Sequence, residues 1–384
     1  MKLNRKNWSE VKFSDVVLNI NKTVKDPLAL GIDKAIGLEN IIPNNLKIQS
    51  VIDIHRDGTK FSKFFKKGQY LFGARRPYLR QMVKADFDGV CTANIMVFDV
   101  KDKNCLSNYY LSLIIQSDVF VNHATVTSVG SLFPNAKWKF LADFKFPIPS
   151  PTEQTEIAEL FQSMETAIEQ AEQQEKNLLK LKKTLSNGLL SKEPGFGNML
   201  NKKNCTPTDF GGIADCFEQH DKQKKDVNRF IGLENIEPEN LKISTWGNIG
   251  DGTTFTKRFS KGDVLFGKRR AYLKKVAIAD FDGICSGDIL VLKAKEKKML
   301  SKLLPFYVSA EAFIQHAVST SAGSLSPRTK WKDLSLFEIS IPDLKTQEKI
   351  LEVFQQIETT LSQLKSQKQT LKNLKQKLLD EILG

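Results

Sequence analysis

The sequence predicts an α+β protein made of two homologous modules, each followed by a long helix. Three observations lead to this prediction. A segment of roughly 150 residues occurs twice in the 384-residue chain. Each copy mixes short β-rich runs with one helical stretch. Each copy is then followed by apolar residues at alternating spacings of three and four.

The internal repeat is strongest in the middle of each module. Gly58–Cys91 aligns with Gly252–Cys285 with 20 identities over 34 positions. Further toward the N-terminus, Ile36–Ile41 recurs unchanged as Ile231–Ile236. A repeat unit of this length is a duplicated module and not an array of small units. We therefore expect two copies of one fold in a single chain.

Each module is predicted to contain short strands and one helix. The β-rich runs lie at Ile48–Ile54, Tyr70–Phe72 and Ile95–Val100, bounded by glycine and Asn/Asp turn signals. A helical stretch is expected near Leu106–Asn122 and again near Leu300–Gln315. An Ile-Pro dipeptide closes each module, because proline cannot continue a central strand.

A long amphipathic helix is predicted after each module. Its narrow apolar stripe is typical of a coiled-coil seam, with a helix packed on its own module as the alternative. Residues 151–191 carry 4 basic and 7 acidic side chains, while residues 344–384 carry 7 basic and 5 acidic side chains. Because their net charges are opposite, the two helices should pair with each other in preference to self-pairing. The predicted seam residues are Ile157, Phe161, Met164, Ile168, Leu178, Leu181, Leu185, Ile350, Phe354, Ile357, Leu361, Leu364, Leu371, Leu374 and Leu378.

These patterns divide the chain into four segments: 1–150, 151–191, 192–343 and 344–384. The net charge of +13 and the pI near 9.3 favour a polyanionic partner, either nucleic acid or an anionic membrane surface. The excess lies in the globular segments, with 22 basic and 13 acidic residues in the first and 24 and 19 in the second. A polyanion should therefore bind the modules and not the helices.

The same composition bears on the compartment. The five cysteines are odd in number and never spaced as Cys-x-x-Cys, which argues against disulfides and a zinc site and favours a reducing cytoplasm. No apolar run approaches the roughly 20 residues of a membrane helix, and no signal peptide is predicted. We expect a cytoplasmic protein that binds no membrane and no metal.

Candidate nucleic-acid contacts lie where a short strand and a glycine precede paired arginines. Arginine forks match guanine edges or phosphate oxygens, and phosphate contact is the more common role. The alternative is that one arginine of each pair holds Asp86 or Asp88, or Asp280 or Asp282. The predicted contacts in these segments are Arg75, Arg76, Tyr78, Arg80, Lys268, Arg269, Arg270, Tyr272, Lys274 and Lys275.

Two hydroxyl-rich loops are the second group of candidates. Short hydroxyls and backbone amides suit phosphate or base-edge contacts, while a turn capped by Ser or Thr is the structural alternative. The predicted contacts here are Thr127, Ser128, Ser131, Lys137, Ser321, Ser324, Arg328 and Lys330.

Motifs of catalysis and cofactor binding are missing from the sequence. Gly262–Arg269 imitates a phosphate-binding loop but lacks its final Ser or Thr, and Ala74 replaces the lysine in the first copy. There is no Gly-x-Gly-x-x-Gly loop and no Asn/Asp-Pro-Pro-Tyr/Phe methyltransferase element. We therefore expect a binding protein without a cofactor and not an enzyme.

In its architecture the chain resembles the specificity subunits of type I restriction-modification enzymes. The resemblance covers essentially the whole chain and rests also on the Lys-Gly-x-x-Leu-Phe-Gly-x-Arg-Arg segments, the Gly-Ser-Leu loops, and the helix starts at Gln154–Ile157 and Gln347–Ile350. It implies that the modules are target recognition domains, each reading half of an interrupted DNA sequence. It also implies an antiparallel coiled coil with pseudo-two-fold symmetry that docks two methyltransferase subunits.

The same resemblance assigns methylation and cleavage to partner subunits, which bring S-adenosylmethionine, ATP and Mg²⁺. A restriction or translocase subunit belongs to some such assemblies. The alternative reading is a stand-alone DNA-binding regulator with two recognition modules on one chain. Complex formation with a methyltransferase separates the two readings.

Overall fold

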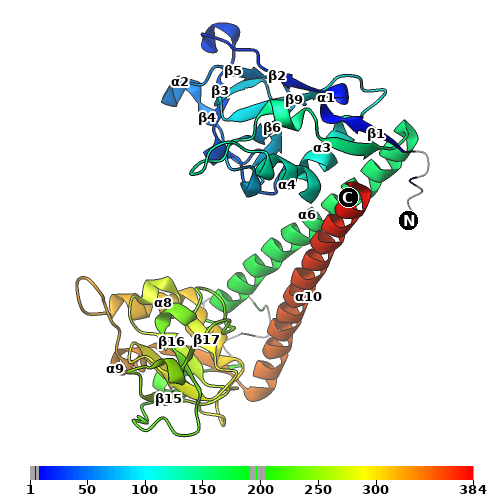
Figure 1. Cartoon of the computed structure of the whole chain (residues 1–384). Helices are drawn as coiled ribbons and strands as arrows, with labels where there is room; N and C mark the ends of the chain where they lie inside the picture. Colours follow the sequence, from blue (N-terminus) through cyan, green and yellow to red (C-terminus); the bar gives the residue numbers. More distant parts are fainter. Residues whose placement is uncertain (1–4, 6–7, 191–195, 197–199, 201–203, 384) are drawn as a thin grey trace. The chain divides into compact units, whose positions relative to one another are not determined.

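The computed structural model describes residues 5, 8–190, 196, 200 and 204–383. The chain forms two compact units, one of Met1–Ala171 with Ser366–Gly384 and one of Glu172–Lys365 (Figure 1). Each unit contains one α+β module and parts of both long helices, so the predicted fold class is confirmed. The units divide the chain differently from the four segments of the sequence analysis, because each helix contributes to both units.

Three small sheets form the first module. One four-stranded sheet has the order β2-β9-β6-β7, another has the order β4-β3-β8-β5, and β1 pairs with β10. All pairings are antiparallel except β3 with β8. The strands are β1 (Ser9–Lys12), β2 (Val17–Ile20), β3 (Lys34–Ile36), β4 (Ile52–Asp53), β5 (Lys63–Phe65), β6 (Tyr70–Gly73), β7 (Met82–Lys84), β8 (Gly89–Cys91), β9 (Ile95–Val100) and β10 (Lys145–Ile148).

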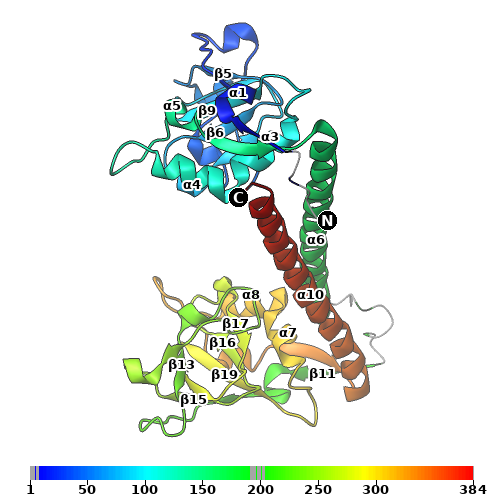
Figure 2. The same cartoon turned by 45° about the vertical axis from the view of Figure 1, so that its right-hand side comes forward.

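The second module repeats these three sheets strand for strand (Figure 2). Its sheets have the orders β12-β19-β16-β17, β14-β13-β18-β15 and β11-β20, and the one parallel pairing is again the equivalent one, β13 with β18. The strands are β11 (Cys205–Asp209), β12 (Ala214–Phe217), β13 (Arg229–Ile231), β14 (Gly247–Asn248), β15 (Lys257–Phe259), β16 (Val264–Gly267), β17 (Val276–Ile278), β18 (Gly283–Cys285), β19 (Ile289–Ala294) and β20 (Glu338–Pro342).

The short helices differ from the sequence prediction. The single helix expected near Leu106–Asn122 is two helices, α3 (Asn108–Gln116) and α4 (Asp118–Val126). Ser117 separates them in an extended conformation, and its Oγ caps α4 by accepting the N–H of Phe120 at 3.2 Å.

The second module has the same break at Ala310, between α7 (Leu304–Ser309) and α8 (Glu311–Ser319). The run predicted at Ile48–Ile54 is mostly irregular and contributes only β4 and the start of α2 (Ile54–Asp57). Two more four-residue helices, α5 (Trp138–Leu141) and α9 (Trp331–Leu334), precede the last strands of the two modules, and α1 (Phe13–Val16) follows β1.

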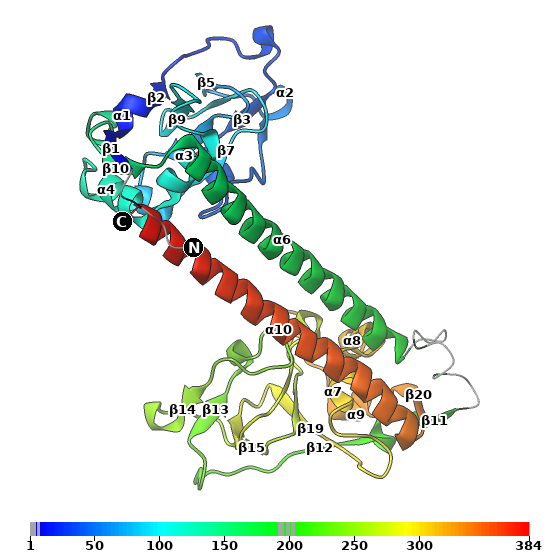
Figure 3. The same cartoon turned by 90° about the vertical axis from the view of Figure 1, so that its right-hand side faces the viewer.

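The long helices are α6 (Pro151–Gly188) and α10 (Leu344–Leu383). In the first unit the start of α6 lies beside the end of α10, and in the second unit the end of α6 lies beside the start of α10 (Figure 3). The helices are therefore antiparallel, as predicted. Glu165 pairs with Lys375 at 2.6 Å in the first unit, and the repeat-equivalent residues, Glu358 and Lys182, pair at 2.5 Å in the second.

These two ion pairs correct part of the predicted seam. Lys182 and Lys375 are partly buried, while the adjacent Leu181 and Leu374 are each 46% exposed. After Leu178, the next residue on the buried side of α6 is therefore Lys182. The sequence prediction had placed Leu181 at that position. The lysine stems cover apolar surface and place each ammonium beside a glutamate on the facing helix.

The end of α10 completes the core of the first module, and the end of α6 completes the core of the second module. In the first unit, Leu379, Ile382 and Leu383 of α10 join the core that contains Ile157 and Phe161 of α6. In the second, Leu189 near the end of α6 joins the core that contains Ile350 and Phe354 of α10. The coiled coil and the module cores are thus continuous within each unit.

A buried glutamine fixes the start of each long helix. Gln154 Nε2 donates to the carbonyls of Cys105 and Pro149 at 2.8 and 3.0 Å, and its Oε1 accepts the N–H of Ser107 at 2.8 Å. Gln347 makes the same three contacts with the carbonyls of Lys298 and Pro342 and the N–H of Leu300. These glutamines satisfy buried backbone groups, so their recurrence has a structural cause.

Candidate nucleic-acid interface

The paired arginines lie on a tight corner that both modules share. In the first module β6 ends at Gly73, and residues 74–80 turn through the 3-10 helix η4 (Pro77–Leu79); residues 268–274 do the same around η9 (Ala271–Leu273). We call these two segments the arginine corners. Arg76 and Arg270 have left-handed backbones with φ of 53°, and so do Arg80 and Lys274. Such conformations are uncommon for residues other than glycine, and both copies keep them at the same places.

A loop packs against each arginine corner, formed by residues 127–137 in the first module and 320–330 in the second. We call these the Gly-Ser-Leu loops; Figure 2 shows the first reaching out from its module between α4 and α5. The backbone N–H of Arg76 donates to the carbonyl of Pro134 at 2.7 Å, and Arg270 donates to Pro327 at 2.8 Å. Corner and loop therefore form one surface in each module, as the sequence could not show.

Three of the predicted hydroxyls have structural roles. Thr127 and Ser128 donate to the carbonyls of His123 and Ala124, and Ser321 donates to Ala317, each at 2.7 Å. These bonds close the last turns of α4 and α8 and favour the Ser/Thr turn reading for these residues. Ser131 and Ser324 differ, because they are exposed and make no side-chain hydrogen bond within the described chain.

Several of the predicted cations are engaged inside their own module, among them Arg80, Lys274 and Lys275. Arg80 pairs with Asp118 and donates to the carbonyl of Gln116 at 3.0 Å. Its equivalent, Lys274, pairs with Glu311 at 2.7 Å. Lys275 donates to the carbonyl of Leu233 at 2.5 Å. Arg80 and Lys274 hold the corners against α4 and α8, so their charge is largely used within the fold.

The two modules hold their arginines differently. In the first, the guanidinium carbons of Arg75 and Arg76 lie 4.2 and 4.9 Å from the ring centroid of Phe133, a cation–π arrangement. In the second, Asp288 pairs with Arg269 at 3.1 Å and with Arg328 at 2.7 Å.

Asp288 is the main acidic partner of the second surface. The hydrogen bond and charge of Arg328 hold the pKa of its carboxyl below the usual range. Among the described residues no ion pair joins these arginines to Asp86, Asp88, Asp280 or Asp282, and Asp88 and Asp282 accept the backbone N–H groups of Lys67 and Lys261 at 2.7 Å. Asp288 aligns with Asn94 in the internal repeat. This difference between the copies was the sequence signal that could have indicated an acidic partner for the arginines of the second module.

The remaining predicted residues lie on the surface of corner and loop. Tyr78, Tyr272, Lys137, Lys330 and Arg270 are exposed. Arg75, Arg76, Lys268 and Arg269 are partly buried, and Arg76 Nε has no hydrogen-bond partner among the described residues. Arg328 is exposed although it pairs with Asp288. Each module therefore presents cations, a tyrosine and a serine on one surface.

No metal-ligand cluster occurs among the described residues. His123 and His316 contact the carbonyls of Phe140 and Asp333 through Nε2 at 3.0 and 2.9 Å, which joins α4 to α5 and α8 to α9. Burial raises the pKa of the Cys91 and Cys285 thiols to about 12, so they are protonated and unreactive. In the part of the chain that the structure describes, no helix is long and apolar enough to cross a membrane.

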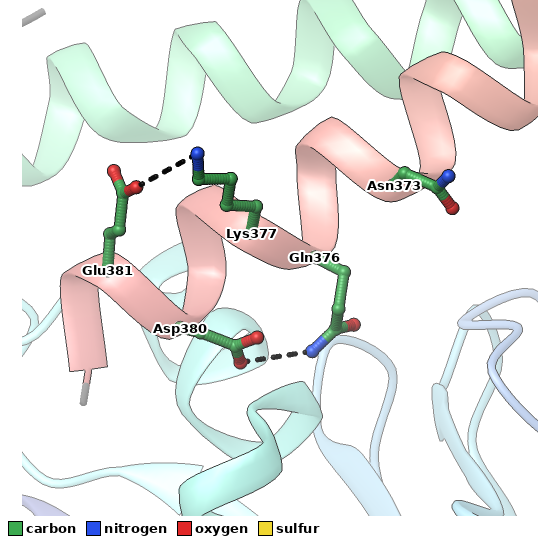
Figure 4. Close-up of a pocket in the computed structure, with 5 residues that line it drawn as sticks. All are labelled: Asn373, Gln376, Lys377, Asp380 and Glu381. Carbon is green, nitrogen blue, oxygen red and sulfur yellow. Dashed lines mark hydrogen bonds and ion pairs between the residues drawn. The ribbon is translucent and has the colours of Figure 1, made fainter.

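A surface hollow lies along α10 near Leu383 (Figure 4), and Asp380 in its lining is close to Asp118 and to Arg80 of the first arginine corner. Its lining side chains engage one another: Gln376 donates to Asp380 at 3.1 Å, and Lys377 lies 3.9 Å from Glu381. All of its lining residues come from a single helix, and Asn373 completes it. It is an open surface feature, and we assign it no ligand.

The chain is similar to known proteins of one family. The family model "Type I restriction modification DNA specificity domain" matches residues 6–181 and 211–373. The chain is 27% identical over 299 residues to the type I restriction enzyme EcoDI specificity subunit of Escherichia coli, a match that covers 67% of this chain and 66% of that protein.

Three solved structures share the fold. A chain from a study of complex assembly and conformational transition of the type I R-M system has 18% identity and a TM-score of 0.64, covering 100% of this chain and 98% of that one. The HsdS subunit from Thermoanaerobacter tengcongensis has 19% identity and a TM-score of 0.52, covering 98% and 96%. The type I restriction-modification S subunit from M. genitalium has 12% identity and a TM-score of 0.57, and the match covers 100% of this chain and 98% of that one.

Proposed function

Because the chain belongs to the type I restriction-modification DNA specificity family, we propose that its two modules each read one half of an interrupted DNA target. The long helices scaffold two methyltransferase subunits, and a restriction or translocase subunit joins some assemblies. The chain contributes recognition, while its partners contribute catalysis. The assembly works in the cytoplasm, where its DNA target lies.

One observation carries this proposal: the surface of arginine corner and loop occurs twice with the same backbone conformation. Four residues other than glycine keep a left-handed φ of 53° in the two corners. Backbone strain that is kept at matching positions of both modules is typical of functional sites. Since each surface exposes cations on a basic module, a phosphate backbone is the partner that fits its charge.

The contacts divide into two groups. Residues on the surface of corner and loop meet the DNA directly, and residues that support the corners and close the ends of α4 and α8 hold them in place. The second group comprises Arg80, Lys274, Lys275, Thr127, Ser128 and Ser321. The first group comprises Arg75, Arg76, Tyr78, Ser131, Lys137, Lys268, Arg269, Arg270, Tyr272, Ser324, Arg328 and Lys330.

The target is a near inverted repeat. The two modules are homologous and each is joined to its long helix in the same way, and duplex DNA has two-fold axes of its own, so equivalent modules should meet equivalent grooves on opposite strands. The half-sites differ at one or two positions, because Asp288 and Arg328 replace Asn94 and Asn135 beside the second arginine corner. A bidentate contact discriminates between bases by about 1–3 kcal/mol, enough to separate the half-sites at such a position.

Co-expression with the neighbouring genes tests the scaffold role. We expect the chain to co-purify with a methyltransferase in a complex whose mass corresponds to one chain and two methyltransferase copies. Mass measurement of the intact complex gives this ratio directly. A chain that binds specific DNA and forms no such complex is instead a stand-alone regulator.

A further inference from the structure

The tips of the two Gly-Ser-Leu loops expose leucine. Leu132 is 81% exposed and Leu325 is 87% exposed, the highest values among the exposed large apolar residues of the described chain. The two leucines are repeat-equivalent, each following the same Gly-Ser pair. Single exposed apolar residues are ordinary on protein surfaces. Two at the same place in both modules, beside the arginine corners, call for a common partner.

Backbone hydrogen bonds hold both loops in shape. Val129 and Asn135 exchange two at 3.0 Å, and Ala322 and Arg328 exchange two at 3.0 and 2.9 Å. Gly130 and Gly323 have φ of 106° and 109°, which residues with a Cβ rarely adopt, so both loops need glycine to turn toward the leucine. The leucine is therefore presented on a closed loop.

Polar and cationic groups lie near both leucines, together with the half-exposed Phe133 and Val129 in the first module. Arg270 Nη2 donates to the carbonyl of Leu325 at 3.2 Å, and Ser324 and Ser326 flank that leucine in sequence. In the first module Ser131 precedes Leu132, and Lys137 ends the loop. The core of a protein–protein interface is depleted of charge, so this setting fits a protein partner poorly. Duplex DNA fits, because its phosphates accept the cations and apolar side chains enter between its base pairs.

We propose that Leu132 and Leu325 are wedges that insert between adjacent base pairs, one in each half-site. Insertion partly unstacks the step and kinks the duplex, which brings more phosphates to the arginine corners. The partly unstacked step also lowers the cost of extruding a nearby base for methylation. This inference rests on the proposed function and names how its recognition surface engages DNA.

The test uses the complete complex and a target duplex identified by methylation mapping. 2-Aminopurine is placed in turn at each step of both half-sites, and fluorescence energy transfer between dyes at the DNA ends reports bending. We expect a fluorescence rise at one step of each half-site. Leu132→Ala should abolish one rise and Leu325→Ala the other, each with loss of part of the bend. A step that rises in every variant reports base extrusion by the methyltransferase.

Matched variants control for loss of an exposed leucine. Leu30→Ala and Leu336→Ala remove leucines that are 65% and 64% exposed elsewhere in the first and second modules, and we expect both signals to persist. Leu132→Met and Leu325→Met should also keep them. Because unstacking offsets much of the gain from burial, affinity in the alanine variants should fall by less than about tenfold. The salt slope should become slightly smaller, since loss of the bend removes phosphates from the arginine corners.

The outcomes separate this proposal from the proposed function. Target binding without any leucine-dependent rise or bend overturns the wedge and leaves DNA recognition intact. A leucine-dependent affinity loss without unstacking has the same consequence, since it indicates apolar contact with thymine methyl groups in the groove. Failure of the complex to bind any methylated target sequence overturns the proposed function itself.

Discussion

Replacing Ile382 by alanine should lower the free energy of unfolding of the first unit by about 2–5 kcal/mol, because it leaves a cavity in a packed core. Ile382 is 1% exposed and belongs to the same core as Phe13 and Phe161, although it is third from the end of the chain. Hydrogen exchange resolved along the sequence measures the effect, since a chain of two units need not unfold in one step. Protection should fall across residues 8–171 and 366–383.

Leu374→Ala is the matched control on the same helix. Leu374 is 46% exposed, so its loss should cost no more than about 0.5 kcal/mol. Leu189→Ala provides the complementary test, because Leu189 is buried in the core of the second unit and should weaken that unit alone. Equal effects of Ile382→Ala and Leu374→Ala would show that the end of α10 does not complete the first core.

Replacing Arg76 and Arg270 together by alanine should remove most specific DNA binding. A bidentate contact to a base contributes about 1–3 kcal/mol, so two lost contacts weaken binding by one to several orders of magnitude. If the contacts are instead to phosphates, the loss should be the same for all sequences and should lower the salt slope by about 1 per arginine. Binding measured at several salt concentrations distinguishes the two.

Arg56→Ala is the control for the loss of positive charge. Arg56 is exposed in the first module and pairs with the adjacent Asp57 at 2.8 Å, outside the arginine corner. We expect near wild-type binding for this variant. The double variant should keep its helical circular dichroism and its association with the methyltransferase. Wild-type affinity in the double variant would refute the assignment of the arginine corners.

Duplication is the reason that so much of the fold could be predicted. Each pattern is present twice, so chance matches to strand or helix periodicity are filtered by agreement between the copies. Short-range signals were nevertheless insufficient at Ser117, whose hydroxyl caps a new helix and breaks the expected one. The pattern also favoured Leu181 over Lys182 as the seam residue after Leu178, because leucine is apolar and lysine is charged. Only the fold shows that Lys182 has an acidic partner, Glu358, on the facing helix.

The site was harder to predict because its decisive contacts join distant segments. Asp288 lies 40 residues from Arg328 in sequence, and Phe133 lies 57 residues from Arg76, yet each pair forms one contact. Arg80 was grouped with the surface cations, although the fold gives it an internal partner in Asp118. Sequence identifies the residue types of a recognition surface, but the tertiary fold decides which charges remain available to a ligand.

Mapping methylated bases in the genome of the host that carries this chain tests the central claim most directly. The account predicts methylation at an interrupted sequence whose two half-sites form an inverted repeat at most positions and differ at one or two. Deletion of the gene should abolish that methylation. Methylation at one continuous site, or at two unrelated half-sites, would contradict the account, because it would mean that the shared corners and loops are scaffold and that other residues read the bases.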